Sequence, residues 1–378
     1  MSEPTQTRSS GTLITALLVL AAMVITLVPP AVMVAAHDDN STEGAVTTVR
    51  KGRLKRGPAK AKAKAKAKVK PAARVLRPAA VRQAKPAPAR AVQHGVVPPA
   101  KQAVAARGVV LSPRRQVPLP PKINATAWAV ADLKTGELLA SHWAYSPRHP
   151  ASTIKLLTAL TAVDHTADRV QADEYAAGQT CSCAGVRPGR TYRRRELLAG
   201  ALLHSGNDAA EALAAGHPQG RQAFYAAMQR KAESLGTRAT RVANASGLTS
   251  EQGWSTARDL MVILRAAVKD PRLAQVMAQP SAQFGPVHGR KYRIERGTDY
   301  VNNTPGSLGK SGYTTPAQNT LVVSTRRAGT NIGVVTLGSP GGYSTSGAAA
   351  LTDWAARHRH QLKAVEKLPD PAPAAQAD

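Results

Sequence analysis

A serine and a lysine three positions apart open a predicted helix near the middle of the 378-residue chain. Ser152 and Lys155 lie in the mostly apolar segment 150–160, and residues three apart share one face of a helix. A serine hydroxyl is a weak nucleophile that needs a base within hydrogen-bonding distance. Lysine can be this base only when its amine is neutral, which requires burial or a nearby cation. We therefore predict that Ser152 is a nucleophile and that Lys155 is its base.

A second polar motif interrupts a predicted helical region at residues 204–208. Its sequence is His-Ser-Gly-Asn-Asp, and apolar helical segments flank it on both sides. One interpretation is a turn between two helices, in which Asn207 or Asp208 caps the second helix. In the functional interpretation, the Ser205 hydroxyl relays protons and the Asn207 amide holds the backbone of a substrate.

A third motif, Lys310-Ser311-Gly312-Tyr313, directly precedes a predicted strand. The Lys310 cation could bind a terminal carboxylate and lower the pKa of Lys155. Gly312 would let a substrate backbone lie against the strand edge. Residues 134–136, Lys-Thr-Gly, form a similar triplet, but they precede Ser152 and connect two predicted strands. We therefore interpret them as a hairpin turn.

Strands are predicted at both ends of the region that carries the motifs, with helices between them. The strand patterns cover residues 126–132, 137–143, 321–325 and 331–337. Helical patterns cover residues 150–160, an alanine-rich stretch to about residue 235, and residues 256–268 and 351–361. This order predicts an α+β fold, in which an antiparallel sheet packs against a helical cluster as a single catalytic domain.

Composition divides the chain into four parts. Residues 1–36 contain a long apolar stretch that ends in small residues, which is typical of a signal peptide or an N-terminal membrane anchor. Residues 37–116 form a Lys/Ala/Pro-rich basic linker that is predicted to be disordered. Residues 117–361 form the catalytic domain, and residues 362–378 form a predicted disordered tail. Whether the first segment is cleaved or retained, we expect an extracytoplasmic protein, in the cell wall or at the outer face of the cytoplasmic membrane.

Most of the positive charge lies in the linker. Residues 50–115 contain 20 Lys and Arg residues and no acid, out of a net charge of +28 for the whole chain. After export, such a segment could bind anionic membranes or wall polymers, or it could be only a solvated spacer. Two Phe and four Trp residues provide little aromatic surface for stacking single-stranded nucleic acid. We therefore predict no nucleic-acid partner.

The three motifs, Ser-x-x-Lys, Ser-x-Asn and Lys-Ser-Gly, occur in one order and each in the expected structural context. This set resembles the penicillin-binding protein and serine β-lactamase superfamily. Within it the chain is most similar to the D-alanyl-D-alanine carboxypeptidases, the low-molecular-mass penicillin-binding proteins. The resemblance covers roughly residues 117–360 and excludes the linker and the tails.

The resemblance implies a serine peptidase that acts on peptidoglycan stem peptides ending in D-Ala-D-Ala and is inhibited by β-lactam antibiotics. Ser152 would attack the penultimate D-Ala carbonyl to form an acyl-enzyme, and Lys155 would accept its proton. Ser205 would pass a proton to the leaving amine, and Asn207 would orient the peptide. No metal or cofactor is implied.

The same resemblance assigns the third motif to substrate binding. Lys310 and Ser311 would hold the terminal carboxylate, with serine replacing the usual threonine at position 311. The backbone N–H groups of Ser152 and Tyr313 would form an oxyanion hole, beside Gly312.

Several alternatives stay open at this point. A transpeptidase or endopeptidase on the same fold would form the same acyl-enzyme. A β-lactamase would need a deacylating glutamate, and none of the candidates lies in the expected Glu-x-x-Leu-Asn setting. A non-enzymatic wall-binding protein is disfavoured by the intact motifs. Cys181 and Cys183 could form a disulfide or remain thiols, and two sulfurs are too few for a metal site.

Overall fold

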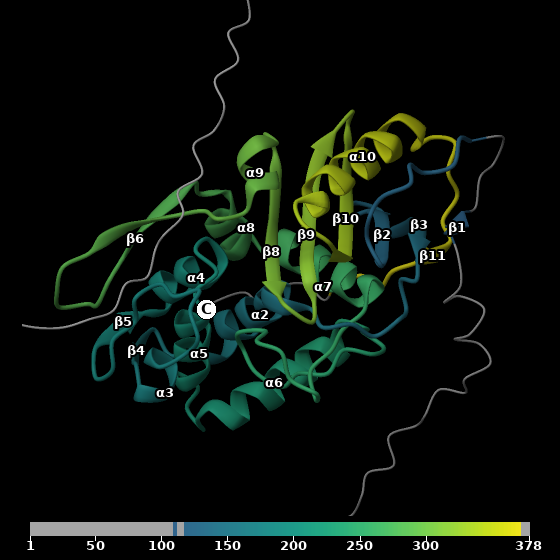
Figure 1. Ribbon diagram of the computed structural model, residues 1–378. Helices are drawn as coiled ribbons and strands as arrows, with labels where there is room; N and C mark the ends of the chain where they lie inside the picture. The colour runs from purple at the N-terminus through teal and green to yellow at the C-terminus, as the bar shows by residue number, and fades with distance from the viewer. Residues whose placement is uncertain (1–108, 112–116, 372–378) are drawn as a thin grey trace, which may run out of the picture. The chain divides into compact units, whose positions relative to one another are not determined.

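One antiparallel sheet organises residues 109–111 and 117–371, which are the residues that the computed structural model describes. Its strands follow the order β1-β3-β2-β10-β9-β8, and β11 also pairs with β3 (Figure 1). Strand β8 therefore forms one edge of the sheet, and β1 and β11 share the other. The strands are β1 (Val109–Leu111), β2 (Ala127–Asp132), β3 (Glu137–His142), β8 (Ser307–Thr314), β9 (Gln318–Arg327), β10 (Thr330–Ser339) and β11 (Glu366–Lys367).

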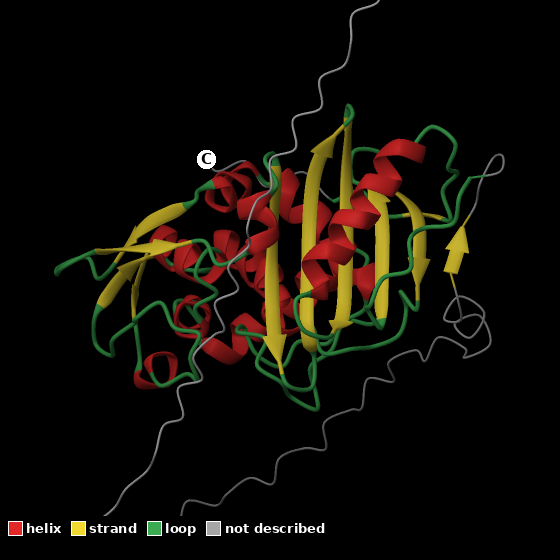
Figure 2. Cartoon of the chain, turned by 45° about the horizontal axis from the view of Figure 1, so that its top comes forward, coloured by secondary structure: helices red, strands yellow, loops and turns green. Residues whose placement is uncertain are grey.

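Both faces of the central strands are buried, because side chains alternate between two apolar cores. On β2, Trp128 and Val130 face one core, whereas their neighbours Ala127, Ala129 and Ala131 face the other. Helix α10 (Tyr343–His358) covers the first face through Leu351 and Trp354, and it lies across the front of the sheet in Figure 2. The other core contains most of the helices. This arrangement confirms the predicted α+β fold.

The helical region lies between β3 and β8 in the sequence. It begins with a short 3₁₀ helix, η1, and includes two small two-stranded sheets, β4–β5 and β6–β7, that the sequence patterns did not predict. Thr256 accepts a hydrogen bond from the Asp259 N–H at 3.0 Å, which caps α7. The elements are η1 (Ala151–Ile154), α2 (Lys155–His165), β4 (Arg169–Gln171), α3 (Glu174–Ala177), β5 (Thr191–Arg193), α4 (Arg194–Leu202), α5 (Asn207–Ala215), α6 (Arg221–Ser234), α7 (Ala257–Lys269), α8 (Pro271–Ala278), β6 (Ser281–Phe284), β7 (Tyr292–Glu295) and α9 (Asp299–Asn303).

The Lys-Thr-Gly triplet at residues 134–136 is the turn of the β2–β3 hairpin. The Asp132 carboxylate accepts hydrogen bonds from the N–H groups of Lys134 and Thr135 at 2.9 and 3.2 Å. Gly136 has a φ of +77°, which favours glycine in a tight turn. The structural interpretation of this triplet is therefore confirmed.

Two predicted boundaries are wrong. The tail from residue 362 was expected to be disordered, but β11 pairs with β3, and Leu362 and Leu368 are buried. Glu366 also receives hydrogen bonds from Arg258, which is only 1% exposed. These partners come from distant parts of the sequence, so the local Pro/Ala-rich composition does not reveal them.

The linker was predicted to extend to residue 116, yet β1 pairs with β3 through residues 109–111. Two adjacent valines have a high strand propensity, and the outer edge of β3 offers free backbone groups. Residues 1–36 and the rest of the linker lie outside the described residues. Among the helices of the described ranges, none combines the length and the apolar character that a membrane span requires.

Candidate active site

A cleft of about 630 Å³ brings residues of all three motifs together. The edge strand β8, the N-terminal end of α5 and the 3₁₀ helix η1 each contribute motif residues to it. The motif residues that line the cleft are Ser152, Ser205, Asn207, Ser311, Gly312 and Tyr313. The two motif lysines lie behind this surface and are buried.

The backbone around Ser152 is fixed by two close glycine contacts. A Cβ atom at Gly312 would lie 2.6 Å from the Ser152 nitrogen, and one at Gly247 would lie 2.0 Å from the Ala151 carbonyl oxygen. Ala151 has a φ of +49°, an unfavourable conformation for a residue with a side chain. The sequence suggested that Gly312 leaves room for a substrate; the structure shows that it leaves room for Ser152 itself.

The Lys155 amine is completely buried and contacts three oxygen atoms. Its Nζ lies 2.7 Å from the Ser152 Oγ, 2.7 Å from the Asn207 Oδ1 and 2.6 Å from the Ser246 carbonyl oxygen. The amide and carbonyl oxygens can only accept hydrogen bonds, whereas a hydroxyl can also donate. A neutral amine has two N–H groups for those two acceptors, which leaves its lone pair for the Ser152 hydroxyl. The contacts therefore suit a lysine that takes a proton from serine.

Burial and charge both favour the neutral form of Lys155. Burial lowers its pKa well below the ordinary lysine value, and the positive charge of Lys310 lowers it further, while Glu211 and Asp208 oppose this shift. Lys310 is also buried, and burial lowers its own pKa to about 7. The expected electrostatic influence of Lys310 on Lys155 is thus present.

The Lys310 side chain does not reach the cleft surface in this structure. It is 1% exposed, and its Nζ donates a hydrogen bond to the Ser311 carbonyl oxygen at 2.6 Å. The Ser311 hydroxyl lines the cleft and lies 3.3 Å from the Thr298 hydroxyl. Of the two, the Ser311 hydroxyl is placed to touch a ligand directly, and Lys310 acts on the cleft through its charge.

The second motif starts α5 and projects into the cleft. Ser205 has a φ of +61°, and α5 begins at Asn207 without a side-chain cap. The alternative in which Asn207 or Asp208 caps this helix is therefore wrong. The Asn207 side chain instead bridges two segments: its Oδ1 accepts from Lys155, and its Nδ2 donates to the Thr180 carbonyl oxygen at 2.6 Å. One amide hydrogen remains for a substrate.

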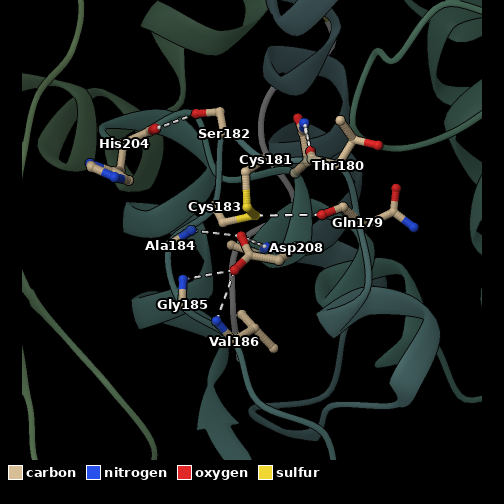
Figure 3. Close-up of a disulfide and its surroundings, with 12 residues drawn as sticks. Gln179, Thr180, Cys181, Ser182, Cys183, Ala184, Gly185, Val186, His204 and Asp208 are labelled. Atoms are coloured by element: carbon tan, nitrogen blue, oxygen red, sulfur yellow. Dashed lines mark hydrogen bonds between the residues drawn. A yellow bond between two sulfur atoms is a disulfide. The ribbon is translucent and has the colours of Figure 1, made fainter. Parts of the chain in front are cut away.

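Cys181 and Cys183 form a disulfide in a loop beside the cleft (Figure 3). We refer to residues 179–186 as the disulfide loop; its residues Thr180, Cys181 and Ser182 line the cleft. The Asp208 carboxylate accepts hydrogen bonds from three consecutive backbone N–H groups of this loop, at 2.7, 2.8 and 2.8 Å. Asp208 thereby ties the disulfide loop to the start of α5.

Sequence patterns missed two contributors to the site, Ser246 and Thr180 of the disulfide loop, because contacts between distant parts of the chain bring them there. The close spacing of Cys181 and Cys183 was a local signal for this loop, since it allowed a disulfide. Within the described ranges, no group of three or more His, Cys, Asp or Glu residues could hold a metal ion.

Comparisons with known proteins agree with this geometry. The family model for D-alanyl-D-alanine carboxypeptidases matches residues 114–341. A D-alanyl-D-alanine carboxypeptidase of Mycobacterium tuberculosis is 40% identical over 256 residues, which cover 65% of this chain and 86% of the relative. A D-alanyl-D-alanine endopeptidase of Pseudomonas aeruginosa is 32% identical over 245 residues, covering 61% of this chain and 77% of that protein.

A solved structure is similar over the same region. The crystal structure of a D-alanyl-D-alanine carboxypeptidase from M. tuberculosis superposes with a TM-score of 0.62 at 38% identity. It covers 68% of this chain, and all of that structure is matched. With the motif residues gathered around one cleft and a family model that spans more than half of the sequence, this chain is a hydrolase that belongs to the D-alanyl-D-alanine carboxypeptidase family.

Proposed function

We propose that this protein removes the terminal D-alanine from peptidoglycan stem peptides through an acyl-enzyme on Ser152. The observation that carries this proposal is the buried Lys155 amine 2.7 Å from the Ser152 hydroxyl. A buried lysine with a lowered pKa can activate a serine that an exposed lysine could not.

In the acylation step, the Ser152 Oγ bonds to the carbonyl carbon of the penultimate D-Ala while its proton moves to the Lys155 Nζ. The backbone N–H groups of Ser152 and Tyr313 stabilise the negative oxygen that forms; one such donor contributes about 3 kcal/mol to lowering a barrier. The Ser205 hydroxyl relays the proton to the leaving nitrogen. The C–N bond then breaks, and free D-alanine departs.

In the deacylation step, a water molecule attacks the ester carbon. Its proton is taken by Lys155 and the Ser152 Oγ leaves with a proton, which restores the starting enzyme and releases the shortened peptide. Asn207 keeps the Lys155 amine aimed at Ser152 throughout, because its Oδ1 accepts one of the two N–H groups.

An endopeptidase is the second candidate, because one relative carries that name. Both reactions use the same acyl-enzyme and differ in the bond that is cleaved. A β-lactamase has less support: Glu211, Glu233 and Glu251, the glutamates that follow the second motif most closely, are absent from the cleft lining.

Labelling with a fluorescent penicillin tests the nucleophile. We expect a stable covalent adduct in the native protein and none in Ser152→Ala, whereas Ser234→Ala, on the exposed side of α6, should label normally. Absence of an adduct in the native protein would refute the proposal, and rapid turnover of the penicillin would favour a β-lactamase. Release of D-alanine from a D-Ala-D-Ala pentapeptide, compared with cleavage of a cross-linked dimer, separates carboxypeptidase from endopeptidase.

We also propose that the protein is exported and that residues 50–115 attach it to anionic membranes or wall polymers. The support is the apolar N-terminal segment and the 20 basic residues of the segment 50–115, which has no acid. Sedimentation with anionic vesicles or wall fragments should be lost at high salt and on deletion of residues 50–115. Equal binding after that deletion would rule out the tether.

A further inference from the structure

One of the two acceptors that orient Lys155 belongs to a segment outside all three motifs. The Ser246 carbonyl oxygen accepts from the Lys155 Nζ at 2.6 Å. Ser246 lies between α6 and α7, where it belongs to no helix or strand. A carbonyl in such a segment can direct a lysine only if its own peptide group is held in place.

The Gly247 N–H, in the same peptide group as that carbonyl, donates to the Asn244 Oδ1 at 2.7 Å, and a buried carboxylate holds the two preceding peptide groups. The Glu211 Oε1 accepts hydrogen bonds from the Ala245 N–H at 2.9 Å and from the Ser246 N–H at 3.0 Å. The Glu211 Oε2 accepts from the Tyr225 hydroxyl, and the Arg221 Nε lies 3.5 Å away. Glu211 has no exposed surface, and a charge in such a place is retained only when donors surround it.

Glu211 and Asn207 also share a helix. They are four residues apart on α5, so they lie on one face of it, and each fixes one of the two acceptors of the Lys155 amine. Asn207 supplies its own oxygen, and Glu211 acts through Ser246. The two contacts together leave the Lys155 lone pair directed at Ser152.

We propose that Glu211 is a positioning residue for the Lys155–Ser152 pair: by accepting from the N–H groups of residues 245 and 246 it fixes the backbone that leads into the Ser246 carbonyl, and this carbonyl orients the lysine amine. The role rests on the proposed acyl-enzyme function but is carried by contacts that do not depend on it. Glu211 touches neither the cleft nor the reacting atoms, which separates this role from that of a deacylating base.

The negative charge of Glu211 has a second effect on Lys155. Three charged groups face the lysine: Lys310 from β8, and Glu211 and Asp208 from α5. Lys310 favours the neutral amine, and the two carboxylates favour the protonated one. Replacing Glu211 by a neutral residue therefore lowers the pKa of Lys155, which moves the acid limb of the pH profile to lower pH.

The experiment uses the full chain with Glu211→Gln, Glu211→Ala and Tyr225→Phe, and with Glu251→Gln as an exposed control. The initial rate of acylation by a fluorescent penicillin is measured across pH. This rate is divided by the concentration of reactive sites, which gives the acylation rate per site. We expect Glu211→Ala to acylate about 10- to 100-fold more slowly, because two buried N–H groups lose their acceptor. Glu211→Gln should recover much of this loss, since its amide oxygen can still accept, yet it should retain the pH shift.

A second measurement does not require activity. With lysine labelled at the ε-carbon, NMR gives the pKa of Lys155, and we expect it to fall in both Glu211 variants and to stay unchanged in Glu251→Gln. A role limited to stability would reduce the number of reactive sites but would not move this pKa or the rate constant per site.

The outcomes separate the two proposals. Acylation per site within twofold of the native rate in Glu211→Ala, with an unmoved Lys155 pKa, overturns the role of Glu211. A native protein that forms no adduct overturns the proposed function, while the NMR titration still decides whether Glu211 acts on Lys155. If Glu211→Ala does not fold, Glu211→Gln still tests the pKa of Lys155. Tyr225→Phe, which removes one donor to Glu211, tests the acylation rate per site, and no change in either variant overturns the role of Glu211.

Discussion

The Nζ of Lys155 lies 2.7 Å from the Oγ of Ser152, at a position where the lysine has no exposed surface. Its amine must be neutral to accept the serine proton. The acylation rate should therefore rise with pH through the pKa of Lys155. It should level off at a pH well below the ordinary pKa of lysine.

Lys310→Met should move this acid limb to higher pH. Removing the cation raises the pKa of Lys155, so a smaller fraction of the amine is neutral at a given pH. The pKa of Lys310 is about 7, so its charge is present below that pH, and there the two profiles should differ most. The measurement is the penicillin acylation rate across pH. Lys134→Met, in the β2–β3 turn, is the control, and a limb that moves to lower pH would contradict the mechanism.

Gly312→Ala should reduce acylation strongly, because its Cβ would lie 2.6 Å from the Ser152 nitrogen. Gly333→Ala in β10 is a matched control: its Cβ would lie 2.6 Å from the Leu133 side chain, in the core rather than at the cleft. We expect both variants to lose about 1–3 kcal/mol of unfolding free energy. Only Gly312→Ala should lose acylation per folded molecule; an equal loss in both would show that overpacking alone explains the effect.

Opening the Cys181–Cys183 disulfide should slow acylation several-fold. Thr180 accepts a hydrogen bond from the Asn207 side chain, and Ser182 accepts one from the Asn207 N–H at 2.7 Å. A looser disulfide loop therefore leaves Asn207 less well fixed against Lys155. The cost in stability should be small, about 1–2 kcal/mol, since the bond closes a very short loop.

The check on this prediction is acylation before and after treatment with a dithiol reductant. The double variant Cys181→Ser/Cys183→Ser should match the reduced protein and should not respond to reductant. Unchanged rates in both samples would show that Asp208 alone holds the loop.

Glu366→Ala should destabilise the fold by about 2–3 kcal/mol, because the buried Arg258 guanidinium loses its hydrogen bonds to this carboxylate and keeps Asp259 and the Gly236 carbonyl. Asp353→Ala removes an ion pair of similar length, 3.1 Å to Arg327. Both partners are well exposed, Arg327 to 53% and Asp353 to 43%. That change should cost at most about 1 kcal/mol. Urea unfolding of the two variants provides the comparison, and equal losses would mean that β11 does not contribute to the stability of the domain.

The catalytic motifs and the central strands could be predicted from the sequence, because both are encoded locally. Continuous runs of mostly apolar residues define β2, β9 and β10, and the Ser-x-x-Lys spacing places Ser152 and Lys155 on one helical face. The turn at residues 134–136 was also predictable, since its order in the chain distinguishes it from the third motif.

The supporting contacts could not be predicted, because they join residues far apart in the chain. Glu211 contacts residues 245 and 246, and Arg258 contacts Glu366. The start of α10 was also placed too late: its first turns are rich in Ser, Thr and Gly, and only the packing of Ala348 and Leu351 on the sheet makes them helical.

Strands β1 and β11 share the outer edge of β3, whereas β8 forms the opposite edge beside Ser152. The first and last strands of the described fold thus lie at one edge of the sheet, and the nucleophile lies at the other. Five inter-strand spacings of about 4.8 Å each separate β1 from β8, so the sheet is roughly 24 Å wide between these two strands. A group attached to β1 would therefore lie about one sheet width away from the cleft.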